Sequence, residues 1–181
     1  RLILRWGVMR NTHAENIQEH SLQAALIAHA LAVIARDVLG RDVNPERVMA
    51  LAAYHEVSEV ITGDLPSPIK HRDPALRSAY GRIEEAARER IFAMLPDELR
   101  PAYRPLLLGG VADTHTQLVR AADKLCAYLK CVEELKGGNA EFATARAAGA
   151  RQIEDLDRPE VRYFMERFAP SFELTLDELN H

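Results

Sequence analysis

The sequence predicts an all-α protein of roughly six or seven main helices, forming one domain over residues 1–181. Apolar residues recur at helical spacing through most of the chain. Asn, Asp, Pro and Gly stand where such segments would begin or end, and no stretch alternates convincingly as a strand does. Of the 181 residues, 48% are hydrophobic and 28% are charged, which is ordinary for a globular domain with one core.

Cap residues and apolar periodicity predict three helices in the first half of the chain, at residues 16–39, 44–55 and 73–95. The first begins with Asn16 and Glu19 in a capping-box pattern. The second and third each begin with a cap residue before proline, at Asn44-Pro45 and Asp73-Pro74. Residues 62–68 contain two prolines and one glycine, and we expect a loop there.

The second half is predicted to contain helices at residues 98–108, 113–136, 139–156, 159–168 and 176–179. Pro101 and Pro105 interrupt the first of them. Residues 113–116 would cap the longest helix, which Gly137-Gly138 would end. Asn139 would cap the alanine-rich helix that follows.

Charge and hydropathy limit the classes of partner. The formal net charge is −4 with no basic stripe, so we expect no nucleic-acid polymer as a partner, whereas a small anionic metabolite is compatible. No apolar run approaches the length of a membrane span, so we expect no membrane partner and a cytoplasmic location. Cys126 and Cys131 lack disulfide and zinc-site spacing and are interpreted as small buried side chains in a reduced compartment.

Four residues on separate helical segments have the chemistry of metal ligands: His20, His55, Glu56 and Asp123. Imidazole nitrogens and carboxylate oxygens together suit divalent ions such as Mn²⁺, Co²⁺, Fe²⁺ or Zn²⁺. His20 would lie in a first helical turn, where a charged imidazole is disfavoured and a neutral, metal-bound one is not. Asp123 is flanked by apolar residues, so its burial requires a cation. The alternatives are an exposed His20 and an ion pair between Asp123 and an arginine.

Further polar residues lie near these ligands in the sequence. Glu59 follows His55 by four residues and would share its helical face if the helix continues. Asp64 follows in the expected loop. Arg5-Trp6 precedes the first helix, and an arginine fork suits a phosphate dianion while tryptophan can pack on a sugar or base. The alternative for the single tryptophan is a place in the core.

The order and spacing of these motifs resemble the bacterial 5′-deoxynucleotidases of the HD-domain superfamily of metal-dependent phosphohydrolases. The resemblance extends over essentially the whole chain and rests on short motifs. They are Arg5-Trp6, Glu19-His20-Ser21-Leu22, His55-Glu56-Val57-Ser58-Glu59, Thr62-Gly63-Asp64-Leu65-Pro66, residues 122–130, residues 163–166 and Pro170-Ser171-Phe172.

The resemblance implies a compact HD-domain helical fold, usually dimeric. It implies hydrolysis of deoxyribonucleoside 5′-monophosphates to deoxynucleoside and phosphate. The implied cofactor is a divalent cation, Co²⁺ or Mn²⁺ first, with Zn, Fe, Mg or Cu also compatible.

The resemblance also implies roles for individual residues. The metal ligands would be His20, His55, Glu56 and Asp123. Glu59 and Glu56 would be catalytic, with Glu59 handling a proton beside the metal. The substrate would contact Arg5, Trp6, His20, Glu56, Asp64, Leu65, Pro66, Ser67 and Asp123. Within that set Arg5 would hold the phosphate, Trp6 would orient it and line the sugar pocket, and the residues from Asp64 to Ser67 would contact the nucleoside.

Glu56 departs from the family pattern, in which this ligand is Asp. Metal sites tolerate ligand displacements of only ~0.2 Å, and one methylene exceeds that unless the side chain folds back or binds differently. We therefore favour a site impaired by Glu56, the alternative being a site adapted to the longer arm. A different nucleotide substrate, or a nucleotide-binding protein with an impaired metal site, remain the other functional readings.

Overall fold

The computed structural model describes residues 1–70, 72–109 and 113–180, and these residues form an all-α fold, as predicted. Seven of the α-helices in the described part have eight or more residues. The α-helices are α1 (Ile17–Val33), α2 (Pro45–Ala53), α3 (Glu59–Thr62), α4 (Ser67–Lys70), α5 (Pro74–Ala93), α6 (Arg100–Leu107), α7 (Thr114–Lys136), α8 (Ala143–Glu154), α9 (Pro159–Arg167) and α10 (Leu176–Leu179). A π-helical segment (Ile34–Val38) extends α1, and two 3₁₀ helices (Ala140–Phe142, Ala169–Glu173) flank α8 and α9.

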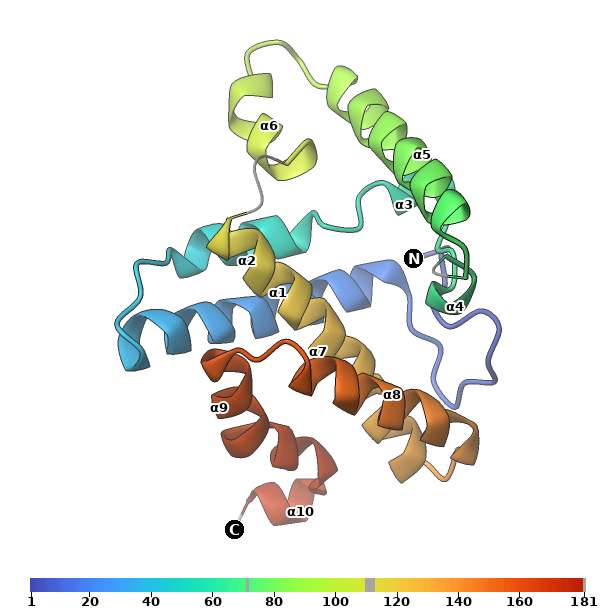
Figure 1. Ribbon diagram of the computed structural model, residues 1–181, viewed down its shortest axis with the longest axis vertical. Coiled ribbons are helices and arrows are strands. Elements are labelled where there is room, and N and C mark those ends of the chain that lie inside the picture. Colours follow the sequence, from blue (N-terminus) through green and yellow to red (C-terminus); the bar gives the residue numbers. More distant parts are fainter. Residues whose placement is uncertain (71, 110–112, 181) are drawn as a thin grey trace.

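The core is formed where α1, α2 and α7 pack together, with α8 and α9 against them (Figure 1). Leu31 of α1 and Leu118, Leu125 and Leu129 of α7 are fully buried there. Cys126 and Cys131 are buried free thiols, as expected from their spacing. The three central helices therefore form a rigid base for any side chain carried near their ends.

The helix Ile17–Val38 is the exception to the expectation that no apolar run approaches a membrane span. Its 22 residues are long and apolar enough to cross a membrane by length and composition alone. The core helix of a soluble protein has the same properties, and α1 packs against α2 and α7.

The predicted caps are present. The Asn16 side chain accepts hydrogen bonds from Gln18 N and Glu19 N, which fixes His20 in the first turn of α1. The Asp113 side chain accepts from Thr116 N at 2.9 Å and begins α7. Ordinary local capping therefore determines where two of the site-bearing helices start.

Three expected boundaries are wrong. The helix that begins at Pro45 ends at Ala53 instead of reaching His55, and residues 54–58 form turns. The loop expected over residues 62–68 is shorter, because α4 starts at Ser67, where Pro68 fits a first helical turn. The alanine-rich helix is also shorter, since 3₁₀ residues 140–142 precede α8.

Helices α5 and α6 form an arm that stands apart from the core (Figure 1). The main packing partners of α5 are α6, α3 and α4, and α6 packs mainly on α5. Only Ala87 and Phe92 are buried along the 20 residues of α5. The arm thus faces the end of α2 and the start of α7 across a cavity described below.

Candidate metal centre

Four predicted ligands meet where α1, α2 and α7 converge. One donor atom from each of His20, His55, Glu56 and Asp123 lies within 4.8 Å of the others. His20 Nε2 is 3.3 Å from His55 Nε2 and 3.2 Å from Asp123 Oδ1. His55 Nε2 is 3.3 Å from Glu56 Oε1 and 4.0 Å from Asp123 Oδ1. The structure therefore brings together residues that are 103 positions apart in sequence, from His20 to Asp123.

These separations fit ligands of a single ion. With metal–nitrogen bonds of about 2.1 Å, the donor atoms of a tetrahedral site are about 3.4 Å apart. The measured distances of 3.2–4.0 Å bracket that value, and the longer arm of Glu56 reaches the same point. Two imidazoles and two carboxylates form a donor set suited to a divalent cation.

Both imidazoles turn Nε2 towards the cluster. His55 Nδ1–H donates a hydrogen bond to the carbonyl oxygen of Ala52 at 2.6 Å, which leaves the Nε2 lone pair free. His20 is completely buried, so the alternative of an exposed first-turn histidine is wrong. The turns at residues 54–58 are what aim His55 at His20, and their position could not be read from helical periodicity.

The two cluster carboxylates are held in the ionised form. Burial opposes this, but the hydrogen bond and charge of His55 lower the pKa of Glu56 to about 2. Likewise the hydrogen bond and charge of His20 lower the pKa of Asp123 against the effect of burial. Arg5 Nη2 also lies 3.7 Å from Asp123 Oδ1, so the arginine alternative for Asp123 is realised beside the imidazoles.

Glu59 lies next to the ligands but not on a continuation of α2. It begins α3, is 7% exposed, and its Oε2 has no hydrogen-bond partner among the described residues. Burial and the charges of Glu56 and Asp64 raise the pKa of Glu59 to about 9. A buried oxygen without a partner is unusual and marks a place where a ligand, water or proton belongs.

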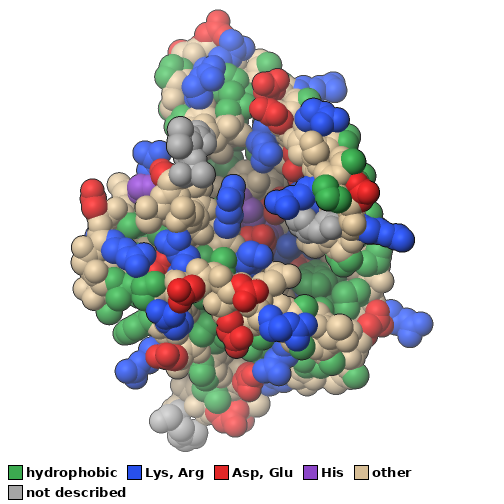
Figure 2. Space-filling model, in the orientation of Figure 1, with side chains coloured by type: hydrophobic (Ala, Val, Ile, Leu, Met, Phe, Trp, Pro, Cys, Tyr) green, Lys and Arg blue, Asp and Glu red, His purple; other side chains and the backbone are tan. Residues whose placement is uncertain are grey.

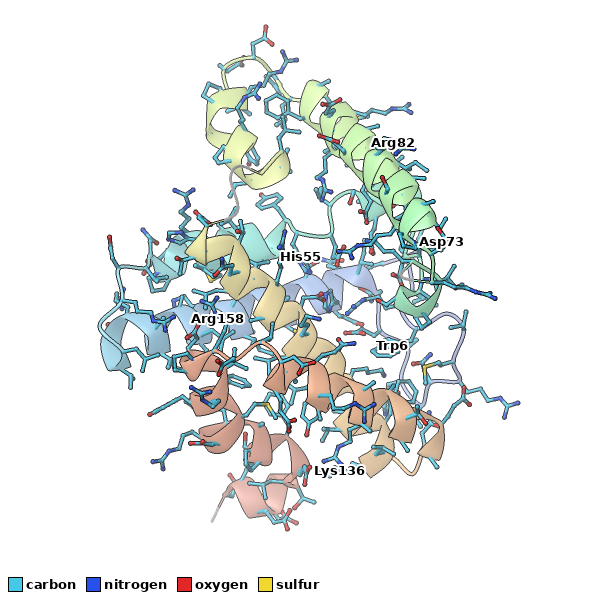
Figure 3. The ribbon with its side chains drawn as sticks, viewed as in Figure 1. Trp6, His55, Asp73, Arg82, Lys136 and Arg158 are labelled. Carbon is cyan, nitrogen blue, oxygen red and sulfur yellow. The ribbon has the colours of Figure 1, made fainter. Side chains whose placement is uncertain are left out.

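Arg5 contacts Nδ1 of His20, whereas His55 faces its Nε2. Trp6 has φ 61°, a left-handed conformation that costs a bulky residue about 1–3 kcal/mol. Its indole N–H donates to Glu15 Oε2 at 2.9 Å, and its ring packs on Phe142 with centroids 5.2 Å apart. The tryptophan is thus fixed by specific contacts and does not line the cavity beside the cluster. In Figure 3 Trp6 and His55 lie on different sides of α1.

A cavity of about 770 Å³ opens onto the cluster from the side of the arm. Its lining includes His55, Glu56 and Asp123 and, from α5 and α7, Arg88 and Arg120. Figure 2 shows a hollow near the centre of this face, bordered by Lys and Arg side chains, with a His side chain visible within it. Arg88 is half-buried and forms no ion pair with any residue that the structure describes.

The predicted nucleoside-contacting residues, Asp64 to Ser67, do not line this cavity. Asp64 is half-buried, and its pKa is raised by burial and by the charge of Glu56, while Arg5 opposes the shift. Leu65, Pro66 and Ser67 follow it into α4 and are not among the residues that line the cavity.

Sequence reasoning missed Glu15. It immediately precedes the Asn16 cap, and nothing in its spacing distinguishes it from an exposed acidic residue. In the structure its side chain is 11% exposed and lies against Arg5, Trp6 and His20. Burial opposes ionisation of Glu15, but contacts with His20 and Arg5 lower its pKa.

Comparisons with known proteins identify the family. A profile described as 5′-deoxynucleotidase YfbR-like matches residues 1–172. A 5′-deoxynucleotidase of Vibrio cholerae is 50% identical, covering 99% of this chain and 93% of its own length, and one of Erwinia tasmaniensis is 48% identical, covering 99% and 91%.

Solved structures share the fold. An HD-domain phosphohydrolase from Listeria innocua superposes with a TM-score of 0.82 at 23% identity, covering 98% of this chain and 86% of that one. The cyanophage S-2L HD phosphohydrolase DatZ, bound to dA and one catalytic Zn²⁺ ion, gives a TM-score of 0.64 at 23% identity, covering 93% and 91%. The predicted family and fold are therefore confirmed, and the chain belongs to the 5′-deoxynucleotidase YfbR-like family.

Proposed function

We propose that this chain is a single-domain, metal-dependent 5′-deoxynucleotidase, a phosphoric monoester hydrolase. The observation that carries the proposal is the cluster of two imidazoles and two carboxylates, which opens onto a cavity and lies beside the buried Glu59, whose Oε2 has no hydrogen-bond partner among the described residues. Relatives with close to half of their residues identical over almost the full chain carry the name 5′-deoxynucleotidase. Phosphate esters need charge neutralisation and positioning more than covalent catalysis, and this site offers both.

The metal ligands in this proposal are His20, His55, Glu56 and Asp123. A bound divalent cation would supply positive charge for the phosphate oxygens and lower the pKa of the attacking water. The mixed nitrogen and oxygen donors suit Co²⁺ or Mn²⁺, which we propose as the working metals, with Zn²⁺ compatible.

Two further residues act on the reacting phosphate. Arg5 Nη2 lies 3.7 Å from Asp123 Oδ1, and Arg5 Nη1 contacts His20, so this guanidinium would bind a phosphate oxygen at the cluster. Glu59 Oε2 would orient the attacking water or protonate the leaving 5′-oxygen, since it is buried beside Glu56 with no competing partner.

The nucleoside would occupy the approach to the cluster. Asp64, whose pKa responds to the charges of Arg5 and Glu56, would contact the sugar. Leu65, Pro66 and Ser67 would contact the nucleoside next to it. Trp6 lies outside the cavity lining and would act on the substrate by orienting Arg5. We expect this placement of the phosphate, together with the contact from Asp64, to discriminate against a ribose 2′-hydroxyl. The cavity lining carries equal numbers of basic and acidic side chains, and Arg88 and Arg120 are the basic groups that would meet an anionic substrate.

The proposed protein is a cytoplasmic homodimer. The arm exposes large apolar side chains that a second copy would cover: Leu76, Ile83, Met94 and Leu99. Cytoplasmic placement follows from the chemistry of the substrate, because deoxynucleoside monophosphates are intracellular metabolites.

The test is phosphate release from a panel of deoxyribo- and ribonucleoside 5′-monophosphates, with Co²⁺ or Mn²⁺ added to metal-free protein. We expect turnover of the deoxy series with little dependence on the base. Comparable rates for ribonucleotides would contradict the sugar-pocket assignment. Turnover of nucleotide polyphosphates alone would favour another phosphohydrolase, and no turnover with tight nucleotide binding would favour a binding protein.

A further inference from the structure

Residues 3–5 and 15–17 lie side by side and bring one carboxylate to several site residues. Leu4 and Asn16 form an isolated antiparallel bridge, and Arg5 N donates to Glu15 O at 2.9 Å. Glu15 therefore stands opposite Arg5, in the residue before the N-cap of the helix that carries His20. Its side chain points inward and is 11% exposed.

The two oxygens of Glu15 serve different partners. Oε2 accepts the indole N–H of Trp6 at 2.9 Å and lies 3.6 Å from Arg5 Nη1. Oε1 lies 3.7 Å from His20 Nδ1. One carboxylate thus contacts the arginine, the tryptophan and the imidazole that the proposed function places around the phosphate and the metal.

The position of Glu15 has a consequence for the tautomer of His20. The Nδ1 atom of His20 faces both Arg5 Nη1, with which it is in contact, and the carboxylate of Glu15. Only the tautomer with its proton on Nδ1 leaves a lone pair on Nε2, which faces His55 and Asp123. Arg5 Nη1 can only donate, so with Arg5 in contact Nδ1 is the acceptor and the ring proton lies on Nε2, towards Asp123. Binding of a metal to Nε2 would move that proton to Nδ1, and Glu15 Oε1 is the carboxylate oxygen placed to accept it.

We propose that Glu15 is a positioning residue that sets the orientation of Arg5 and Trp6 and that would accept the Nδ1 proton of His20 when Nε2 binds a metal. The inference deepens the proposed function and rests on it for the identity of the phosphate ligand. Glu15 is not one of the four cluster residues and does not line the cavity, so it acts through Arg5, Trp6 and His20.

Isosteric replacement with a neighbouring control tests the proposal. Glu15→Gln removes the charge and keeps the shape. Glu15→Asp keeps the charge and shortens the arm. Glu19→Gln is the control, because Glu19 is an exposed carboxylate four residues further on, in the first turn of α1, and it accepts only from the backbone N–H of Asn16 at 3.3 Å.

Three readouts are measured for each full-length variant. Titration of metal-free protein with Co²⁺ gives the Kd for the metal alone. Trp6 is the only tryptophan, so its fluorescence reports its own environment. Steady-state kinetics at saturating Co²⁺ separate KM from kcat for a deoxynucleoside monophosphate.

For Glu15→Gln we expect Co²⁺ affinity to fall about 10- to 100-fold, a raised KM and a changed Trp6 emission maximum. Glu15→Asp recovers part of these losses, and Glu19→Gln shows none of them. A Co²⁺ Kd and KM within twofold of the wild-type values in Glu15→Gln would overturn the proposal, as would equal losses in Glu19→Gln. If the wild-type protein releases no phosphate, the proposed function fails, while the Co²⁺ and fluorescence results still decide the role of Glu15.

Discussion

Glu56 brings its carboxylate both to the ligand cluster and to Glu59. Its Oε1 is 3.3 Å from His55 Nε2, and a hydrogen bond with Glu59 acts on the pKa of both residues. The longer side chain of Glu56 therefore reaches the metal position, but it also forms a hydrogen bond with Glu59, the residue that would transfer the proton. We expect Glu56→Asp to retain one metal per chain and to raise kcat about tenfold, because retraction by one methylene releases Glu59. Metal analysis and phosphate release at matched pH and saturating metal measure both quantities.

The opposite outcome is equally informative. If Glu56→Asp loses metal or leaves kcat unchanged, the surrounding residues are adapted to glutamate, and the impairment expected from the sequence is wrong. The distances of 3.2–4.0 Å in the cluster agree with metal binding in either case.

A substitution at Glu59 separates the catalytic step from metal binding. Glu59→Gln keeps the volume of the side chain but removes its acid–base function, and it leaves the four cluster residues in place. We expect kcat to fall by about 10²–10⁴-fold with unchanged metal content. Glu154→Gln, at an exposed position on α8, is the control. Near-normal turnover in Glu59→Gln would remove it from the mechanism.

At the scale of elements, the sequence predicted the helix caps but not the turns at residues 54–58. Asn16 and Asp113 cap α1 and α7 through bonds to residues two or three positions away, so their pattern is visible locally. The end of α2 at Ala53 has no such signal, because residues 54–58 turn in order to pack and to aim His55. The same limit explains Glu15, whose partners Arg5 and Trp6 become neighbours only through the bridge between Leu4 and Asn16.

A second buried carboxylate ties the N-terminal segment to the end of α7. Glu134 is 1% exposed and accepts from Thr12 N and Thr12 Oγ1 at 2.8 Å, from Asn139 Nδ2 at 2.8 Å and from Lys130. Burial opposes ionisation, but these hydrogen bonds lower the pKa of Glu134 below its usual 4.5. The segment that leads to Arg5-Trp6 and Glu15 is therefore held in place by α7.

The lowered pKa of Glu134 sets the sign of a pH effect on stability. An acid with a depressed folded-state pKa contributes stability that is complete above its unfolded pKa, about 4.5, and is lost as the pH falls towards the folded value. We expect Glu134→Gln to lower the free energy of unfolding by about 3 kcal/mol at pH 7, since it leaves Lys130 buried without its partner. Urea unfolding at pH 7 and pH 4 should show the difference from wild type shrinking at pH 4. A constant difference, or an equal loss in the exposed neighbour variant Glu133→Gln, would contradict this account.

At the scale of the whole molecule, the arm formed by α5 and α6 exposes apolar side chains that no part of the same described chain covers. Helix α5 buries two of its 20 residues, while Leu76 and Ile83, one heptad apart on the same face, are 40% and 54% exposed. A cavity wall that positions substrate requires a rigid support, and a second copy packed on this face would supply it. The arm would then connect assembly with the shape of the cavity that leads to His55, Glu56 and Asp123.

We therefore expect sedimentation equilibrium of the wild-type protein to give twice the mass of one chain. Ile83→Glu should shift the equilibrium towards the monomer, because a charge in an apolar interface is desolvated without a partner. Its KM should rise as the arm loses support, and its thermal midpoint should become less dependent on protein concentration. Ser78→Glu adds the same charge to an exposed position on another side of α5 and should leave the mass unchanged. A wild-type protein that remains monomeric at all concentrations would show that the arm is rigid by its packing on α3 and α4 alone, and that the exposed side chains of α5 serve no second copy.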